Sequence, residues 1–328
     1  MMRTTVNTTN TAIGIAAMLA SSAAFSQGAE NYPSRTVTIV APYSPGAGAE
    51  IEGRLWANEL GKNLGQQFVM DFKPGAAQIL GMSYAARQKP DGYTLVWTTS
   101  TYSLLPLMTR EKGFDPYKDF DPVALMSKRS ALLVVSNNLP VKNMQEYIAY
   151  AKANPGAINF ATGGLGGIQH LTGLWLTSAT DTRVTFVHYK SISAAYPDIM
   201  AGRANMAPGT LAGWLPMVKA GKLRAIATAS LQRNPMLPDM PTATEQGVPG
   251  FEYSSWLGMI APARTPMSIV NKIHAEFVKI SKNPELKEKL GDETQLLTLG
   301  PAEFRKAAMA ETERFRKILV DNNLKIEE

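Results

Sequence analysis

The sequence contains no cysteine, and this absence removes several kinds of site at once. Disulfides, thiolate nucleophiles and zinc sites with cysteine ligands are all excluded. Histidine is scarce as well, and the spacings of its three residues fit no metal-binding motif: His170, His188 and His274. A metal site would have to rest on carboxylates alone. We therefore expect neither a metal nor any other cofactor.

A strong charge of one sign is also lacking. Charged residues make up 18% of the 328-residue chain and hydrophobic residues 45%, a balance typical of a globular protein with room for two domains. The formal net charge is +6, but Lys and Arg are scattered and form no basic stretch interleaved with aromatics. Nucleic acid is therefore not an expected partner. A mild positive excess attracts anions in general.

No hydrophobic run reaches the roughly 20 residues that a membrane-spanning helix needs. The apolar stretch near the N-terminus, residues 11–20, is about half that length. Arg3 precedes it, and the small residues Ala24 and Ser26 follow it at the positions that a signal peptidase requires. The pattern predicts a signal peptide over residues 1–26, cleaved after Ser26. The mature protein is expected to be soluble and to lie outside the cytoplasm.

Short β-rich runs alternate with amphipathic helical runs along the rest of the chain, which indicates an α/β fold with helices flanking mostly parallel sheets. The clearest strand-like runs are residues 36–42, 93–99, 131–136, 158–163 and 223–229.

Stretches rich in glycine and proline, residues 115–122 and 234–249, are the candidates for crossings between two lobes. Two crossings return the end of the chain to the first lobe. We therefore expect a first lobe from residues 30–128, a second lobe over 129–240, and a return to the first lobe over 241–328.

The sharpest candidate for a binding site is the loop PYSPGAGAE, residues 42–50, between the first strand and the first helix. Its glycines let the backbone approach a ligand, and the N–H groups at the start of the helix attract an anion. A dinucleotide site is a weaker interpretation because Ile51 replaces the third glycine of that fingerprint. A tight turn without a binding role is the structural alternative.

A second glycine-rich loop, ATGGLGGIQH at residues 161–170, also joins a strand to a helix. Two such loops in different halves of the chain suggest jaws that close on one ligand. His170 could contact that ligand, although a buried packing role is the more common one. The hydroxyl-rich segment 98–103 could bind a carboxylate or cap a helix. Lys190 could be the countercharge of the ligand carboxylate, or it could be solvated.

Several segments resemble the periplasmic solute receptors of tripartite tricarboxylate transporters, the Bug-type proteins. The matching segments include YPSRTVTIVAPYSPGAGAE, KPGAAQILG, PDGYTL, LPVKNMQEYIAYAKANPGAINFATG, VKAGKLRAIA, LPDMPTATEQGVPGFE and WLGMIAPARTP. The resemblance covers essentially the whole mature chain and implies a two-lobed periplasmic-binding-protein (Venus flytrap) fold. It also implies a small-molecule carboxylate as ligand, transporter membrane subunits as partners and a periplasmic location. We expect a monomer.

Family members typically hold the carboxylate with backbone groups of the first loop and with loops of the second lobe. Carried over to this sequence, the first-lobe contacts are Tyr43, Ser44, Gly46, Ala47, Gly48, Ala49, Thr99 and Thr101. The second-lobe contacts are Gly163, Gly164, Gly166, Gly167, Ile168, Tyr189, Lys190 and Ser191.

This chain departs from the family pattern at several positions near those loops. Asn205 and Gly209 stand where Asp is often found, and His188 replaces a proline. Glu50 stands where a shorter Asp is common, and Ile168 replaces a hydroxyl residue. Fewer carboxylates favour a ligand without an amine, such as an aromatic or longer dicarboxylate. The alternative is that these changes only repack the rim of the cleft.

The sequence shows none of the common enzyme signatures: no G-x-S-x-G, no P-loop and no H-E-x-x-H. We therefore interpret the chain as a binding protein and not as an enzyme. Two alternatives stay open at this point. One is a sensory receptor that reports a bound carboxylate to a membrane signalling protein, and the other is an exported hydrolase with His170 or His188 as its base.

Overall fold

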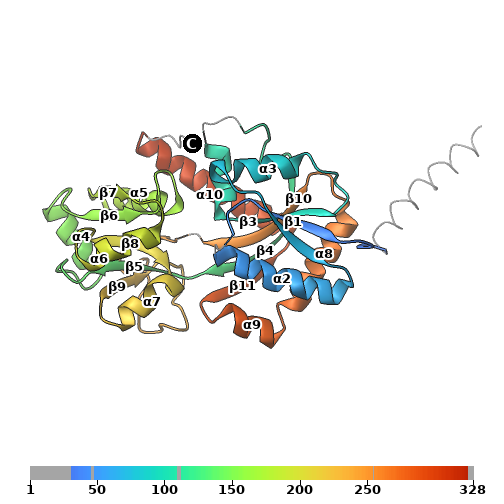
Figure 1. Cartoon of the computed structure of the whole chain (residues 1–328). Helices are drawn as coiled ribbons and strands as arrows, with labels where there is room; N and C mark the ends of the chain where they lie inside the picture. The colour runs from blue at the N-terminus through green and yellow to red at the C-terminus, as the bar shows by residue number, and fades with distance from the viewer. Residues whose placement is uncertain (1–30, 46–47, 109–111, 254, 324–328) are drawn as a thin grey trace, which may run out of the picture.

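The computed structural model describes residues 31–45, 48–108, 112–253 and 255–323, so the expected signal peptide lies outside the described residues. Two α/β lobes stand side by side, each built on its own sheet (Figure 1). The two-lobed α/β fold expected from the sequence is confirmed. Within the described residues, no helix combines the length and the apolar character needed to cross a membrane.

The first lobe contains a six-stranded sheet in the order β11-β4-β10-β3-β1-β2. Its strands are β1 (Val37–Ala41), β2 (Phe68–Phe72), β3 (Thr94–Thr99), β4 (Phe120–Arg129), β10 (Trp256–Pro262) and β11 (Thr294–Leu299). Its helices are α2 (Gly48–Leu64), α3 (Ile79–Ala86), α8 (Met267–Ile280), α9 (Pro284–Leu290) and α10 (Pro301–Asp321). Short 3-10 turns are η1 (Ala76–Gln78), η2 (Ser100–Ser103) and η3 (Leu105–Leu107).

The second lobe contains a five-stranded sheet in the order β7-β6-β8-β5-β9. Its strands are β5 (Ala131–Ser136), β6 (Asn159–Thr162), β7 (Thr185–His188), β8 (Met206–Thr210) and β9 (Leu223–Thr228). Its helices are α4 (Met144–Ala153), α5 (Ile168–Thr180), η4 (Ile192–Ala195), α6 (Tyr196–Met200) and α7 (Leu211–Lys219).

Both sheets are mixed rather than mostly parallel. β1 pairs in parallel with β2 and β3, but β10 runs antiparallel to both β3 and β4. In the second lobe, β6 pairs in parallel with β7 and β8, while β5 runs antiparallel to β8 and β9. The antiparallel pairs arise where the strands next to the crossings, β4, β5, β9 and β10, join their sheets.

The chain crosses between the lobes within extended segments. β4 leads into β5 with one residue, Ser130, between them. On the way back, Val248, Phe251 and Tyr253 still pack in the second-lobe core with β5 residues, and β10 begins at Trp256. The stretches 115–122 and 234–249 both precede the points where the chain passes between the sheets. The first crossing is a nearly continuous strand that needs no glycine or proline, and the second comes between Tyr253 and Trp256.

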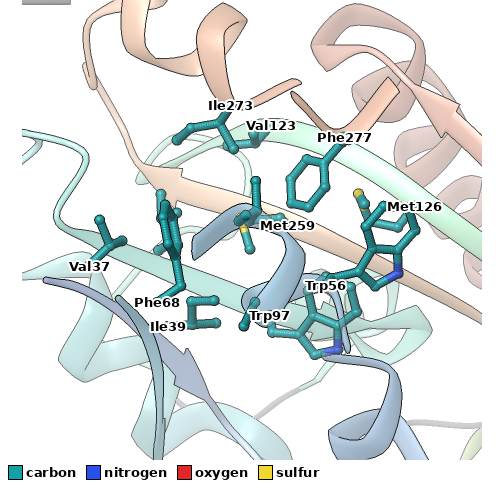
Figure 2. Close-up of a cluster of buried hydrophobic side chains, with 14 of the residues drawn as sticks. Val37, Ile39, Trp56, Phe68, Trp97, Val123, Met126, Met259, Ile273 and Phe277 are labelled. Carbon is teal, nitrogen blue, oxygen red and sulfur yellow. The ribbon is translucent and has the colours of Figure 1, made fainter. Parts of the chain in front are cut away.

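The cores follow from the residue patterns. In β1 and β5, branched and other apolar residues are buried on both faces because helices or neighbouring segments cover each sheet. On α8, the stripe Ile269, Ile273 and Phe277 faces inward. Figure 2 shows Phe277 beside Trp56 of α2, with ring centroids 5.4 Å apart in an edge-to-face arrangement.

Helix α10 also links the lobes. Its Phe304, Phe315 and Leu319 belong to a buried cluster that includes Leu171 and Leu174 of α5, a helix of the second lobe. In Figure 1, α10 accordingly lies at the junction of the two lobes. The second lobe is therefore held by two chain crossings and by a packed helix pair.

Candidate functional site

The first glycine-rich loop follows β1 and leads into α2, as expected from the sequence. Gly46 and Ala47 lie outside the described residues, Ser44 is exposed, and Gly48 begins α2. The carbonyl oxygen of Ala49 accepts a hydrogen bond of 3.0 Å from Trp97 Nε1 of β3. This bond fixes the first turn of α2 against the neighbouring strand, so the N–H groups of the helix start are held at the carboxyl edge of the sheet.

Tyr43 presents a buried hydroxyl group in this loop. Its ring lies edge-on to Phe72, with centroids 6.3 Å apart. Among the described residues, its hydroxyl has no hydrogen-bond partner. Burial, followed by the negative charges of Glu50 and Glu52, raises the pKa of Tyr43, so the hydroxyl keeps its proton. A buried donor without a partner is unusual in a folded protein and is available to a ligand acceptor.

Thr99 and Thr101 lie where β3 ends, next to that loop. Thr99 is the N-cap of η2, and its Oγ1 accepts a hydrogen bond of 3.3 Å from the N–H of Thr101. The capping alternative is therefore observed. The same Oγ1 also accepts a 3.0 Å hydrogen bond from Gln78 Nε2, and Gln78 belongs to the loop between β2 and α3. Sequence analysis did not identify Gln78 as part of this edge.

The second glycine-rich loop joins β6 to α5. Gly163 leaves little room for a side chain, because a Cβ there would lie 3.0 Å from the backbone nitrogen of Ile192. Gly164 and Gly166 have φ values of +141° and +71°, which favour glycine. Gly167 is the N-cap of α5, and no side-chain oxygen caps this helix. Its first N–H groups are therefore not used by a side-chain cap.

Ile168 and the segment 189–191 complete the expected second-lobe residues. Ile168 is half-buried and packs against buried clusters of both lobes. The Tyr189 hydroxyl donates to Asp198 Oδ2 at 2.8 Å, while the Ser191 hydroxyl oxygen accepts from the Ala194 N–H at 3.3 Å and so caps η4. Lys190 is exposed and forms no ion pair within the described part of the chain.

His170 is hydrogen-bonded to the backbone of the second glycine-rich loop. Its ring is 5% exposed, and its Nδ1 accepts a hydrogen bond of 3.1 Å from the Gly166 N–H. The rings of Phe186 and His188 each lie edge-on to it at 4.8 Å. Burial, followed by the nearby His188, lowers the pKa of His170 to about 4. His170 is therefore a buried packing residue, and its hydrogen bond to Gly166 also stabilises the conformation of the loop.

His188 lies on the exposed edge strand β7. Its Nδ1 and Thr162 Oγ1 are 2.7 Å apart, and Thr162 is the last residue of β6, directly before the glycine-rich loop. Burial lowers the pKa of His188. The two histidines thus support the two ends of the same loop. Within the described residues, neither imidazole is hydrogen-bonded to a serine or aspartate side chain. Thr162 is the one threonine whose hydroxyl is hydrogen-bonded to either ring, as a nucleophile would be to its base.

Two departures from the family pattern have structural explanations. The side-chain oxygen of Asn205 accepts a hydrogen bond of 2.8 Å from the Asn159 N–H at the start of β6. Gly209 lies against the Trp214 ring, where a Cβ would come within 2.2 Å of Nε1. Both residues therefore make contacts inside the second lobe, which is in keeping with the alternative that these changes only repack the rim of the cleft.

Glu52 connects the start of α2 with the crossing between the lobes. Its carboxylate is fully buried and accepts hydrogen bonds from the Ser127 hydroxyl, from Arg129 at 3.1 Å and from Trp56 Nε1 at 3.4 Å. Arg129 is the last residue of β4, and its N–H donates to the Ser255 carbonyl at 2.8 Å. One buried carboxylate therefore joins the helix behind the first loop to both crossing segments.

Apart from Ile168, which packs against clusters of both lobes, the described contacts of the expected site residues lie within one lobe. The contacts between lobes run through α5, α10 and the crossings. A pocket of about 700 Å³ lies at the crossings and is lined by residues such as Arg129, Asn234 and Glu293, but none of the expected ligand residues lines it. Among the described residues, no group of His, Asp and Glu could hold a metal ion.

The model of the family described as "Tripartite tricarboxylate transporter family receptor" matches residues 53–324. Among solved structures, Rpa4515 of R. palustris with adipate is 29% identical, with a TM-score of 0.77, and the match covers 90% of this chain and 100% of that one. The periplasmic binding protein BugD is 27% identical, with a TM-score of 0.74 and coverages of 90% and 100%. MatC (Rpa3494) of Rhodopseudomonas palustris with bound malate is 28% identical, with a TM-score of 0.73 and coverages of 88% and 100%.

The Glu52→Ala variant is expected to lose about 3 kcal/mol of unfolding free energy, because it leaves the partly buried Arg129 guanidinium without its carboxylate. Urea denaturation measures this loss. Glu313→Ala is the matched control, since it removes an exposed pair with Arg316 and should change stability by less than about 1 kcal/mol. Equal effects of the two variants would contradict the connecting role of Glu52.

The burial of His170 beside His188 predicts a pH dependence of stability. In the unfolded chain His170 titrates near its ordinary pKa of 6.5, whereas in the folded protein its pKa is about 4. Between these values the unfolded chain binds more protons, so the free energy of unfolding falls as the pH drops from 6.5 towards 4. His170→Gln keeps an acceptor but does not titrate. Melting temperatures measured over this range should fall less steeply in the variant, and parallel curves would refute the prediction.

Proposed function

Because this chain belongs to the tripartite tricarboxylate transporter receptor family, a family of transport receptors and not of enzymes, we propose that it captures a small dicarboxylate in the periplasm for a secondary transporter. The membrane subunits of that transporter would receive the closed, ligand-bound form. We further propose that residues 1–26 direct export and are removed after Ser26, in keeping with Arg3 and the apolar stretch that follows it.

The observation that carries this proposal is the pair of glycine-rich strand-to-helix loops, one in each lobe. Each loop ends at the start of a helix longer than three turns, α2 or α5. Such a start carries unpaired N–H donors and the positive end of the helix dipole, and both features favour a carboxylate. A donor set in each lobe can bind one carboxylate group of a two-headed ligand.

Side chains of the first lobe add neutral donors to this edge. The buried Tyr43 hydroxyl keeps its proton, and the Thr99 and Thr101 hydroxyls lie at the end of the neighbouring strand. In the second lobe, the exposed Lys190 supplies a mobile positive charge beside Ser191. Neutral hydroxyl donors bind a carboxylate less tightly than a fixed, buried cation would. Such donors suit a receptor, because a receptor must release its ligand unchanged.

Two relatives of similar fold support the choice of a dicarboxylate. The structures of Rpa4515 and MatC hold adipate and malate respectively, and both are dicarboxylates. Binding energy closes the lobes only if the ligand contacts the closed form better than the open form, so a ligand with a carboxylate at each end fits a receptor with a donor loop in each lobe.

A thermal-shift panel with isothermal titration tests the ligand class. We expect stabilisation by at least one of adipate, malate, succinate and phthalate, since a ligand at 100 times its Kd adds about 2.7 kcal/mol to the unfolding free energy. Aspartate serves as the amine-bearing comparison for succinate. Saturable binding confined to aspartate would overturn the preference for an amine-free ligand, and no response to any acid would overturn the function.

The role of the second loop is tested with two glycine variants of the same kind. Gly164→Val and Gly156→Val each place a side chain at a positive φ, +141° and +79°, with no atom within 4 Å of the new Cβ. Both variants should lose about 1–2 kcal/mol of stability from backbone strain. Only Gly164→Val should weaken binding of the dicarboxylate, by tenfold or more, because Gly156 lies between α4 and β6, outside the proposed site. Equal affinities would remove the second loop from the site.

A further inference from the structure

The loop between β2 and α3 holds two residues other than glycine in the left-handed region. Ala76 has a φ of +44° and Gln78 a φ of +79°. A side chain at such a position strains the backbone, because the Cβ atom crowds the following carbonyl oxygen. Gly75, in the same loop, shows that the chain uses glycine nearby for this conformation. Strain of this kind persists when the surrounding structure enforces it, and it is concentrated at binding sites.

The side chain of Gln78 has a second unfavourable feature. It is 9% exposed, and its Oε1 atom is buried without a hydrogen-bond partner among the described residues. Gln78 precedes α3 in the N-cap position, yet its side chain does not cap the helix. Its Nε2 donates instead to Thr99 Oγ1 at 3.0 Å. A buried amide whose oxygen has no partner destabilises the fold, and no capping bond to α3 offsets this cost.

Gln78 lies at the edge of the sheet from which the first ligand loop leaves. Thr99 is the last residue of β3, directly before η2. Gly81, near the start of α3, packs so closely on Pro42 that a Cβ at Gly81 would lie 2.7 Å from the Pro42 ring. Pro42 directly follows β1 and opens the glycine-rich loop. The strained loop is therefore packed against the first-lobe part of the proposed site.

We propose that Gln78 is a specificity-determining residue whose amide donates a hydrogen bond to a carboxylate oxygen of the ligand. The Thr99 hydroxyl can accept from Nε2 or donate to Oε1, so half a turn of the amide preserves the bond between the two side chains. That half turn exposes the two N–H groups of Nε2 to the ligand. A carboxylate oxygen only accepts hydrogen bonds, so it selects this arrangement.

This inference rests on the proposed function, and it gives a reason for glutamine at a position where glycine would be relaxed. A glycine at position 78 would remove both the strained Cβ and the half-satisfied amide. In a receptor, the unpaired end of the amide gains its partner only when the ligand binds. The free energy of that new bond then adds to ligand affinity and does not contribute to the stability of the unliganded protein.

The test compares Gln78→Gly with Ala76→Gly, two substitutions that relieve the same kind of strain in one loop. For both variants, the urea midpoint of the unliganded protein is expected to equal or exceed that of the wild type. Titration with adipate, malate, succinate and phthalate should show a tenfold or greater loss of affinity in Gln78→Gly for the acid that the wild type binds best. Ala76→Gly, which removes no hydrogen-bonding group, should bind that acid as the wild type does.

A third variant separates a ligand contact from a structural brace. Gln78→Glu keeps the length of the side chain but replaces the amide donor with a negative charge, so it should lower dicarboxylate affinity further than Gln78→Gly does. A lowered urea midpoint with unchanged affinity in Gln78→Gly would show that Gln78 only braces Thr99, and would overturn the proposal. If the wild type binds none of the acids, the proposed function fails. If the wild type binds and Gln78→Gly binds equally well, only the present inference fails.

Discussion

The buried carboxylate of Glu52 is the interaction on which the geometry of the first lobe depends. Taking a charge out of water costs several kcal/mol unless partners replace the lost hydration. Ser127, Arg129 and Trp56 supply those partners, so the start of α2 and the end of β4 must keep their relative positions. The glycine-rich loop before α2 is thereby positioned relative to the strand that leaves for the second lobe.

Much of the architecture could be predicted from the sequence, because alternating strand and helix patterns are local signals. The two glycine-rich loops were located correctly, and the positive φ of Gly164 explains the need for glycine there. The glycine- and proline-rich stretches did not mark the crossings. Glycine and proline mark turns, whereas the chain passes between sheets at Ser130 within nearly continuous strand. The sheet that a strand joins is decided by long-range packing, as the second-lobe contacts of Phe251 show.

Glycine is the only local signal in the sequence that marks the candidate site. Gln78 carries no local signal, because its left-handed backbone and its bond to Thr99, 21 residues away, arise from tertiary structure. The part played by His170 likewise depends on Phe186 and His188, which bury its ring from a different strand. The direct contacts expected of Gly163, Tyr189 and Lys190 with a ligand stay predictions, since the contacts described for these loops lie within the second lobe.

The packing of α10 against α5 shapes the way in which the two lobes can approach each other. With two strand crossings alone, the second lobe could rotate freely about the line that joins them. The buried contact of Phe315 and Leu319 with Leu171 and Leu174 adds a third attachment away from that line. A rotation of one lobe against the other would therefore also have to move α5 relative to α10, because the two helices share a buried cluster. Because the second glycine-rich loop leads directly into the N-terminus of α5, any such movement would carry the N–H groups of that loop with the helix.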